Sequence, residues 1–262
     1  MGILNLTPDS FSDGGLHMTV DGALRHTEQM LAAGADMIDL GGESTRPGAP
    51  EVAVAEECRR VIPVLEAIVA RFPDVAISVD TSKPEVMRAA IAAGAWMIND
   101  VTALGAEGAF DAVRDAEVAV CLMHMQGSPR TMQTSPHYVD VIEDIITFLQ
   151  DRVGACEAAG ISRRRIVIDP GFGFGKTLAH NYTLLRELRA LLRLELPILV
   201  GMSRKSMIGQ VLSAPADARV TGSAILAALA LERGASIVRA HDVRETVEAV
   251  RLVRAMNELG TE

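Results

Sequence analysis

One short pattern recurs along this chain and restricts its fold more than any other feature. In each copy a helix-like stretch ends at a glycine, a short apolar run follows, and a polar residue closes the run. Three copies are LAAGADMIDLGG (31–42), IAAGAWMINDV (91–101) and LERGASIVRAHD (231–242), and a looser one is EAAGISRRRIVIDPG (157–171). Glycine suits the left-handed position that ends a helix, and such apolar runs are typical of strands buried on both faces of a parallel sheet. The pattern predicts helices that alternate with buried parallel strands.

Eight apolar runs fit this description. The expected strands are Ile3–Leu6, Met37–Leu40, Ala76–Val79, Met97–Asn99, Ala119–Met123, Ile166–Asp169, Ile198–Val200 and Ile237–Arg239. The expected helices are Val20–Ala33, Val54–Ala70, Pro84–Ala93, Ala109–Ala116, Val139–Ala159, Tyr182–Leu192, Val220–Arg233 and Arg244–Leu259. This alternation predicts an α/β fold, a (β/α)8 TIM barrel with its active site at the C-terminal ends of the strands. A doubly wound open sheet is the alternative, which the count of eight and the absence of a G-x-G-x-x-G motif disfavour.

The composition limits the number of domains, the kinds of partner and the cellular location that we expect. No linker, low-complexity segment or charge block interrupts the 262 residues, so we expect a single domain over 1–262. Hydrophobic residues make up 49% of the chain, but no run approaches the length that crosses a membrane. The net charge of −9 argues against a nucleic-acid partner. The first strand leaves no room for a signal peptide before it, and three scattered cysteines are typical of reduced thiols, so we expect a cytoplasmic location.

Polar side chains stand at the ends of the expected strands, where barrels of this kind keep their active sites. They are Asn5, Asp39, Asp80, Asn99, Asp100, His124, Asp169, Ser203, Arg204, Lys205, Arg239 and His241. Asp100 and Asp242 are expected to cap or brace the segments that follow them. Asp39 fits a structural role as well as a catalytic one. His124 fits a satisfied histidine at the rim slightly better than a ligand.

One residue pair and two loops indicate what the barrel mouth binds. Arg239 and His241 are two residues apart on a strand, so both point to the same side and predict an anion site. The segment GGESTRPGAP (41–50) carries Arg46, which taken alone fits a solvated loop arginine. In DPGFGFGKT (169–177) the glycines let the backbone approach a ligand, and the phenylalanines suggest an aromatic partner. No H-E-x-x-H motif, Cys/His cluster, catalytic carboxylate pair or G-x-S-x-G elbow is present.

Eight segments together resemble the dihydropteroate synthase family, whose members act in the folate pathway and are the targets of sulfonamides. The segments are ILNLTPDSFSDGG, GGESTRPGA, SVDTSKP, AGAWMINDV, LMHMQGSP, IDPGFGFGK, VGMSRKSMIG and RAHDV. They follow the family's order, lie at all eight strand ends and cover nearly the whole chain. Members usually carry a segment before the first strand that has no counterpart in this sequence, so the closure of the lower end of the barrel is left open.

The resemblance implies a reaction and its partners. A dihydropterin that carries a CH2–diphosphate condenses with the amino group of p-aminobenzoate, giving 7,8-dihydropteroate and pyrophosphate. Diphosphate bound to Mg2+ leaves readily, the electron-rich pterin stabilises the cation left behind, and a neutral aniline is a nucleophile, so no general base is needed. The resemblance also implies sulfonamide inhibition and a homodimer. Val220–Arg233 is apolar on more than one face, which fits either a dimer surface or a deeply buried helix.

Site residues follow from the matching motifs. Those implied to bind the pterin are Asp80, Asn99, Asp169 and Lys205, with Asp169 accepting from the ring N3–H and 2-amino groups. Those implied to bind the diphosphate are Asn5, Thr45, Arg46, Arg239 and His241, with Asn5 also a ligand of Mg2+. Those implied to lie near p-aminobenzoate are Phe11, Thr45, Pro47, Phe174, Lys205 and Ser206, and the loop Thr7–Gly15 is expected to close over the substrates.

Two other classes of function stay open. A related pterin barrel that transfers a methyl group from a methylated folate would also use a buried aspartate and asparagine, but it has no use for Arg46, Arg239 and His241 around a diphosphate. A non-catalytic pterin-binding homologue is the other alternative, and the intact set of site residues argues against it.

Overall fold

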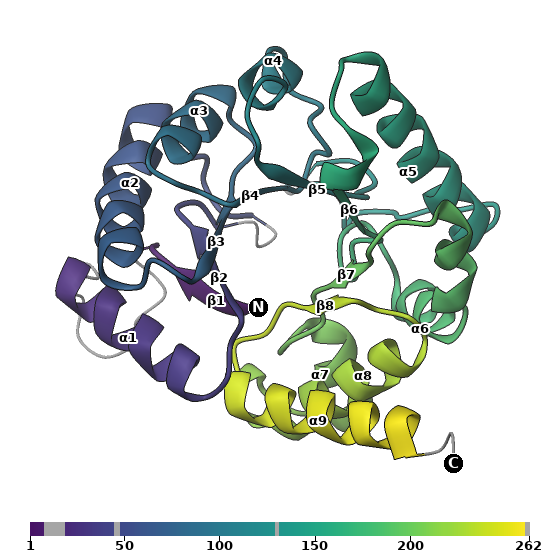
Figure 1. The fold of residues 1–262 in the computed structure, drawn as a ribbon. Helices are drawn as coiled ribbons and strands as arrows, with labels where there is room; N and C mark the ends of the chain where they lie inside the picture. The colour runs from purple at the N-terminus through teal and green to yellow at the C-terminus, as the bar shows by residue number, and fades with distance from the viewer. Residues whose placement is uncertain (8–18, 45–47, 129–130, 260–262) are drawn as a thin grey trace.

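The computed structural model describes residues 1–7, 19–44, 48–128 and 131–259, in which eight parallel strands form a ring with helices around it (Figure 1). The strands are β1 (Gly2–Asn5), β2 (Met37–Gly41), β3 (Ala76–Asp80), β4 (Met97–Asp100), β5 (Ala119–Met123), β6 (Ile166–Asp169), β7 (Leu199–Val200) and β8 (Ile237–Val238). The helices are α1 (Val20–Ala32), α2 (Val54–Arg71), α3 (Pro84–Ala92), α4 (Ala109–Val113), α5 (Val141–Ala158), α6 (Leu178–Arg186), α7 (Ser206–Leu212), α8 (Val220–Glu232) and α9 (Val243–Leu259). Three short 3-10 helices are η2 (Arg163–Arg165), η3 (Leu188–Leu194) and η4 (Ala216–Arg219).

The sheet closes on itself. Strands β1 to β6 pair in chain order and β7 pairs with β8. A bridge between Ile168 and Ile198 joins β6 to the segment that leads into β7. A second bridge between Gly2 and Ala240 joins β1 to the end of β8, so the ring is complete. The (β/α)8 barrel is confirmed, and the open sheet is excluded because both of its edges would be unpaired.

The described residues form two apolar cores, on which the side chains at the mouth of the barrel rest. One lies between the strands and the helices, and the other fills the interior of the barrel with Met97, Cys121, Val167 and Leu199. Alternate residues of a strand face opposite sides of the sheet. Residues two positions further on, such as Asn99 and Asp169, therefore point inward one layer higher. The strand alternation alone thus directs polar side chains into one end of the barrel.

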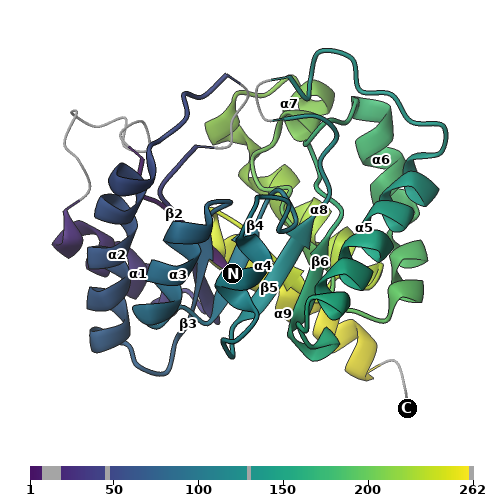
Figure 2. The same ribbon diagram turned by 90° about the horizontal axis from the view of Figure 1, so that it is seen from above.

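The helices differ from the expected elements in two places. The stretch expected as one helix over Tyr182–Leu192 is divided into α6, which begins earlier after the N-cap Thr177, and η3. Helix α7 was not expected from the sequence, because seven residues are too short to show a helical period. It starts directly after Lys205 and lies at the end of the barrel to which the strands run (Figure 2).

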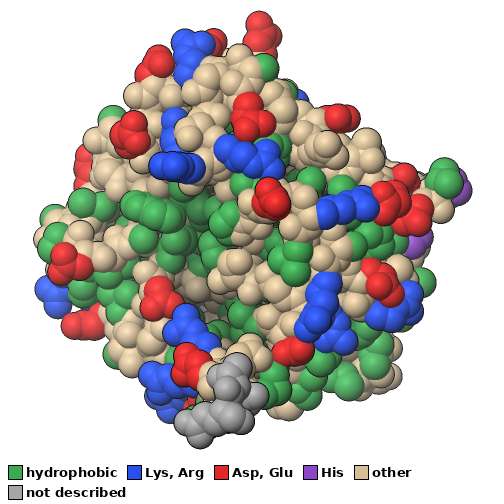
Figure 3. Space-filling model, turned by 45° about the vertical axis from the view of Figure 1, so that its right-hand side comes forward, with side chains coloured by type: hydrophobic (Ala, Val, Ile, Leu, Met, Phe, Trp, Pro, Cys, Tyr) green, Lys and Arg blue, Asp and Glu red, His purple; other side chains and the backbone are tan. Residues whose placement is uncertain are grey.

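The surface and the thiols agree with the composition. On the face drawn in Figure 3, acidic and basic side chains are interspersed with hydrophobic ones and form no block of one sign. Within the described ranges, every helix is too short or too polar to span a bilayer. Cys121 and Cys156 are buried, Cys58 is partly buried, and all three are free thiols.

Candidate active site

A row of residues crosses the barrel mouth from β1 to β4. Asn5, Gly41, Asp80 and Asn99 are register partners on these four neighbouring strands. A Cβ atom at Gly41 would lie 3.6 Å from Asn5 Oδ1 and 3.9 Å from Asp80 Cβ. A Cβ at Gly41 would thus be in ordinary van der Waals contact with both residues, so the Asn5 carboxamide and Asp80 lie close to each other at the mouth.

Arg239 joins two buried carboxylates across the barrel. Its Nε donates to Asp39 Oδ2 at 2.6 Å, and its Nη2 donates to Asp80 Oδ2 at 3.0 Å. Burial raises the pKa of Asp80 while the positive charge of Arg239 opposes the rise. Burial acts to lower the pKa of Arg239, but Asp39 and Asp80 outweigh it and raise that pKa. Arg239 is therefore a cation of fixed charge, with a side chain that is 20% exposed.

Asp39 is a site residue whose role the sequence left open. Its side chain is fully buried inside the barrel, where Oδ2 also lies 3.5 Å from the amide nitrogen of Asn99. Its Oδ1 has no hydrogen-bond partner among the described residues. The strand alternation could have indicated this position, because Asp39 shares the inward face of β2 with Gly41. The structure makes Asp39 the partner that orients Arg239.

Asp169 stands at the end of β6 on the opposite wall. Its Oδ1 accepts the backbone N–H of Gly171 at 2.7 Å, which fixes the carboxylate at the start of the glycine-rich loop. Burial raises the pKa of Asp169, and the nearby charge of Lys205 opposes the rise. A carboxylate has about four acceptor sites, so one bond to Gly171 leaves capacity for a ligand with two parallel donors.

Lys205 and Phe174 lie together on the same wall. The Lys205 ammonium donates to the carbonyl of Phe172 at 2.5 Å and lies 4.5 Å from the centroid of the Phe174 ring. Burial lowers the pKa of Lys205 to about 8, while Asp169 opposes that shift. Ser206, the next residue, begins α7 and is exposed. The structure thus brings together Asp169, Lys205 and Phe174, as the motifs implied.

Lys176 has a position that sequence reasoning missed. Its buried ammonium donates to the carbonyls of Gly171 (2.8 Å) and Phe174 (3.0 Å) and lies 3.0 Å from His124 Nδ1. Burial lowers the pKa of Lys176 to about 7 and the pKa of His124 to about 3. Neutral His124 therefore accepts at Nδ1, which agrees with its expected role as a satisfied rim histidine. The only sequence signal was a lysine directly after the GFGFG run.

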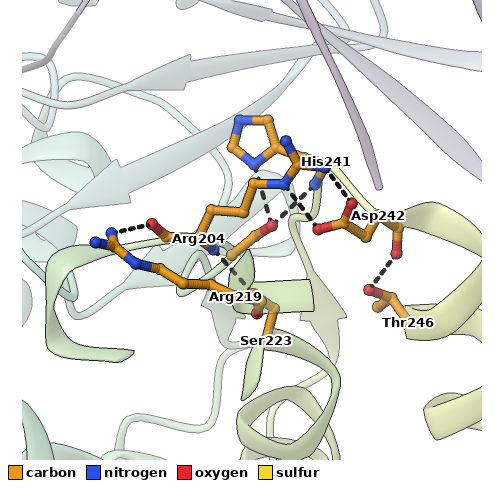
Figure 4. Close-up of polar contacts among 7 residues, drawn as sticks. Arg204, Arg219, Ser223, His241, Asp242 and Thr246 are labelled. Atoms are coloured by element: carbon orange, nitrogen blue, oxygen red, sulfur yellow. Dashed lines mark hydrogen bonds and ion pairs between the residues drawn. The ribbon is translucent and has the colours of Figure 1, made fainter. Parts of the chain in front are cut away.

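The ends of β7 and β8 are linked by side chains (Figure 4). Ser203 Oγ accepts the backbone N–H of His241 at 3.1 Å and lies 3.0 Å from His241 Nδ1. Arg204 forms a two-pronged ion pair with Asp242. The expected bracing role of Asp100 is confirmed, because its oxygens accept N–H groups of Thr102 and Leu104 in the turn after β4.

Four residues implied by the motifs lie outside the described residues. They are Phe11, Thr45, Arg46 and Pro47. Of the same loop, Glu43 is described: its Oε1 accepts the N–H of Val52 at 2.9 Å and its Oε2 forms an ion pair with Lys83. The base of the loop after β2 is thus tied to the barrel.

The fold and these side chains define a barrel enzyme with a polar ligand site at the carboxyl ends of its strands. A sequence model of the family described as pterin binding enzyme matches residues 1–241. The chain therefore belongs to the pterin binding enzyme family, and the relatives it matches are dihydropteroate synthases.

Three similar proteins illustrate this membership. The dihydropteroate synthase of Escherichia coli strain K12 is 54% identical over 255 residues, which is 97% of this chain and 90% of that protein. A crystal structure of Yersinia pestis dihydropteroate synthase in complex with a sulfonamide drug has a TM-score of 0.95 at 55% identity and covers 98% of this chain and 93% of its own. The Burkholderia cenocepacia dihydropteroate synthase complexed with 7,8-dihydropteroate has a TM-score of 0.89 at 49% identity, over 99% of this chain and 91% of its own.

Proposed function

We propose that the chain catalyses the condensation of (7,8-dihydropterin-6-yl)methyl diphosphate with p-aminobenzoate, which gives 7,8-dihydropteroate and pyrophosphate in folate biosynthesis. The family membership and the similarity to a synthase complexed with 7,8-dihydropteroate support this reaction. The observation that carries the proposal is the division of the mouth into two walls. One wall holds Asp169, Lys205 and Phe174, and the other holds Arg239 between Asp39 and Asp80.

The first wall is suited to the pterin. The Asp169 carboxylate can accept two parallel bonds from the pterin N3–H and 2-amino group. Lys205 is placed to donate to the ring carbonyl and a ring nitrogen, because its ammonium is held between Phe172 and Phe174. Asp80 and Asn99, on the strands opposite this wall, are assigned to the remaining polar edges of the ring. The acceptor Asp169 and the donor Lys205 therefore fit a ring with donors on one edge and acceptors on another.

The p-aminobenzoate is assigned to the outer part of the same wall. Phe174 offers a ring face, Lys205 offers a cation, and Ser206 lies exposed at the start of α7. Phe11, Thr45 and Pro47 belong to this assignment by their motifs. Sulfonamides share the aromatic amine and the acidic group of p-aminobenzoate, so they are expected to compete at this position.

The second wall is assigned to the diphosphate and Mg2+. Arg239 and His241 supply hydrogen-bond donors, with Thr45 and Arg46 assigned by motif. No group of three or more His, Cys, Asp or Glu able to hold a metal exists within the described part of the chain. Asn5 Oδ1, an amide oxygen at the barrel mouth close to Gly41, fits a Mg2+ that takes its other ligands from phosphate and water. When bound, Mg2+ would neutralise charge on the departing diphosphate.

The residues act by positioning and by electrostatics. Asp169 and Lys205 fix the pterin, so its methylene carbon faces the amine held beside Phe174. Negative charge grows on the bridging oxygen as the C–O bond breaks, and Arg239 and His241 are placed to stabilise it. The amine then forms the C–N bond and loses a proton. A side chain poised as general base is unnecessary, because the anilinium formed is a strong acid.

One assay tests the reaction. Pyrophosphate release from the pterin diphosphate is measured with and without p-aminobenzoate, and dihydropteroate is quantified in parallel. We expect release that depends on p-aminobenzoate and matches dihydropteroate one to one. A methyl-transferring barrel or a binding protein without activity would release no pyrophosphate under either condition, and that result would refute the proposal.

A homodimer is the assembly we propose. Hydrophobic side chains are exposed on three neighbouring helices, α7, α8 and α9 (Figure 1). They are Val211, Leu212, Ile225, Leu229, Leu252, Met256 and Leu259. Apolar surface of this kind marks association sites.

In light scattering we expect twice the chain mass of 27.9 kDa. The variant Ile225→Glu should shift the protein to monomer, whereas Val139→Glu, at a more exposed residue outside these helices (93% against 55%), should not. A monomer for the unmodified chain at all micromolar concentrations excludes the dimer.

The remaining expectations are proposals of the same kind. The whole chain is proposed to act as one pterin-binding barrel domain, because a single apolar core includes buried residues of all eight strands. A cytoplasmic location is proposed because the free thiols and the small-molecule substrates fit that compartment. No nucleic-acid or membrane partner is proposed.

A further inference from the structure

The turn after β7 carries an arginine in a conformation that favours glycine. Residues 202–205 form a β-turn, closed by a bond from Lys205 N–H to the carbonyl of Met202 at 3.1 Å. Arg204 is its third residue and has φ of +57°. A left-handed φ at this position of a turn is adopted by glycine at little cost, whereas a side chain strains it. Because an arginine occupies this position, we expect its side chain to make contacts that offset the strain.

Four polar groups of Arg204 are hydrogen-bonded, namely its backbone N–H and carbonyl and the side-chain Nε and Nη2 (Figure 4). Its N–H donates to Ser223 Oγ at 2.9 Å, and its carbonyl accepts from Arg219 Nη1 at 2.9 Å. Its guanidinium donates Nε to Asp242 Oδ2 at 2.9 Å and Nη2 to Asp242 Oδ1. Ser223 in turn donates to the carbonyl of Arg219 at 2.7 Å. These contacts tie the turn to the start of α8 and to the loop after β8.

The Arg204–Asp242 ion pair is one of two side-chain links between the loop after β7 and the loop after β8. Ser203 contacts His241, and the next residues along each loop, Arg204 and Asp242, contact each other. Asp242 also directly precedes α9, and its carbonyl accepts the Thr246 N–H at 3.1 Å and the Thr246 hydroxyl at 2.8 Å. The Asp242 side chain is only 10% exposed, so this two-pronged pair is shielded from water on that side.

We propose that Arg204 is a positioning residue that holds the loop after β7 at a set distance from the loop after β8. The first loop presents Lys205 to the pterin, and the second presents His241, next to Arg239, to the diphosphate. The two ends of one substrate are therefore bound by loops whose spacing the Arg204–Asp242 pair sets. This inference rests on the proposed function of those residues.

A ligand that spans both loops should lose more affinity when their spacing changes than fragments that contact only one loop. When two sites are held at the right distance, binding of one end of a ligand raises the effective concentration of the other end. Loss of the spacing removes that gain and leaves the affinity of each isolated part nearly intact. A purely structural role of Arg204 would instead weaken all ligands alike.

The test uses Arg204→Gly, which deletes the pair while relieving the strain of the turn. The probes are 6-hydroxymethylpterin, inorganic pyrophosphate with Mg2+, and 6-hydroxymethylpterin diphosphate, measured by calorimetry on the full chain. We expect each fragment to bind within about threefold of the parent and the joined ligand to bind at least about tenfold more weakly. We expect kcat/KM for the reactive substrate to fall in parallel with the joined ligand.

Controls separate the possible causes. Glu195→Gly changes another exposed residue with left-handed φ, remote from these loops, and should leave all three affinities unchanged. Arg204→Lys and Asp242→Asn test the pair in chains that keep the turn's side chain, and both should show the same selective loss at smaller size. They also decide the matter should Arg204→Gly not fold.

The outcomes are distinct. If the joined ligand loses no more affinity than the two fragments together, the positioning role is refuted. If the unmodified chain fails to form dihydropteroate, the proposed function fails instead, and the fragment comparison still reports whether the two loops are coupled.

Discussion

Two buried cations at the barrel mouth differ in what surrounds them. Arg239 lies between the carboxylates of Asp39 and Asp80, which keep it charged. Lys176 contacts two carbonyls and an imidazole, and its pKa is lowered to about 7. Burial acts against the charge of both side chains, so the partners decide the outcome.

The difference matches the roles that the proposed reaction gives to the two walls. A cation of fixed charge beside the departing diphosphate stabilises growing negative charge at any physiological pH. Lys176, with a pKa of about 7, holds the carbonyls of the glycine-rich loop and carries only part of a positive charge near Asp169 around neutral pH. Substitution of each cation, or of a carboxylate near it, tests whether the partners cause this difference.

The largest effect is expected for Arg239→Met. We expect kcat/KM to fall by about two to three orders of magnitude, because donors to the leaving group are lost. The free energy of unfolding should fall by about 3–5 kcal/mol, because Asp39 and Asp80 remain buried without a cation. Pyrophosphate release and urea denaturation measure the two effects.

Two further variants separate catalysis from stability at Arg239. Arg239→Met combined with Asp39→Asn should regain part of the lost stability and none of the lost turnover. Arg239→Lys should recover part of the turnover, because lysine is charged but lacks the planar fork. Turnover that returns together with stability in the double variant would show that Arg239 only holds the fold.

A smaller effect is expected for Asp169→Asn. The amide replaces one acceptor by an NH2 group that faces donors of the pterin, and we expect a loss of about 2–4 kcal/mol of pterin binding. Calorimetry with a pterin that lacks phosphate measures it, and a thermal melt shows that the variant is folded. Affinity within a few-fold of the parent would contradict the assignment of Asp169.

The smallest effect concerns pH and Lys176. The folded-state pKa is about 7 and the ordinary lysine value is 10.5, so between these values the unfolded chain binds more protons. Lys176 therefore makes stability rise with pH over this window, and Lys176→Met should remove that rise. Urea denaturation between about pH 7 and pH 9.5 measures the slope.

Lys83→Met is the matched control for this titration. Burial acts to lower the pKa of Lys83, but hydrogen bonds to Glu43 and Glu57 outweigh it and raise that pKa, so Lys83 stays charged across the same window. Its removal should lower stability by a constant amount and leave the slope unchanged. Equal slopes for the parent and Lys176→Met would show that Lys176 keeps its charge in the fold.

The sequence predicted the ring of strands because the signal for each strand is local: a glycine before the strand, an apolar run within it and a polar residue at its end. It also named Asp169, Lys205 and Phe174, since their motifs lie next to strand ends. Helix α7 was missed because it is too short to show a period. The partners of Arg239 were missed because Asp39 is 200 residues away in the chain, and pairing across a barrel leaves no local signal.

The glycine-rich loop after β6 also limits how this protein can change under selection. A Cβ at Gly171 would lie 1.9 Å from the carbonyl oxygen of His124, and one at Gly175 would lie 2.5 Å from that of Gln126, and both residues have left-handed φ. Any replacement of either residue displaces the backbone that carries Asp169 and Phe174. Resistance to an inhibitor that binds beside Asp169 and Phe174 is therefore expected to arise from side-chain substitutions or from changes in other loops. Substitutions that alter the backbone path of the loop after β6 are not expected.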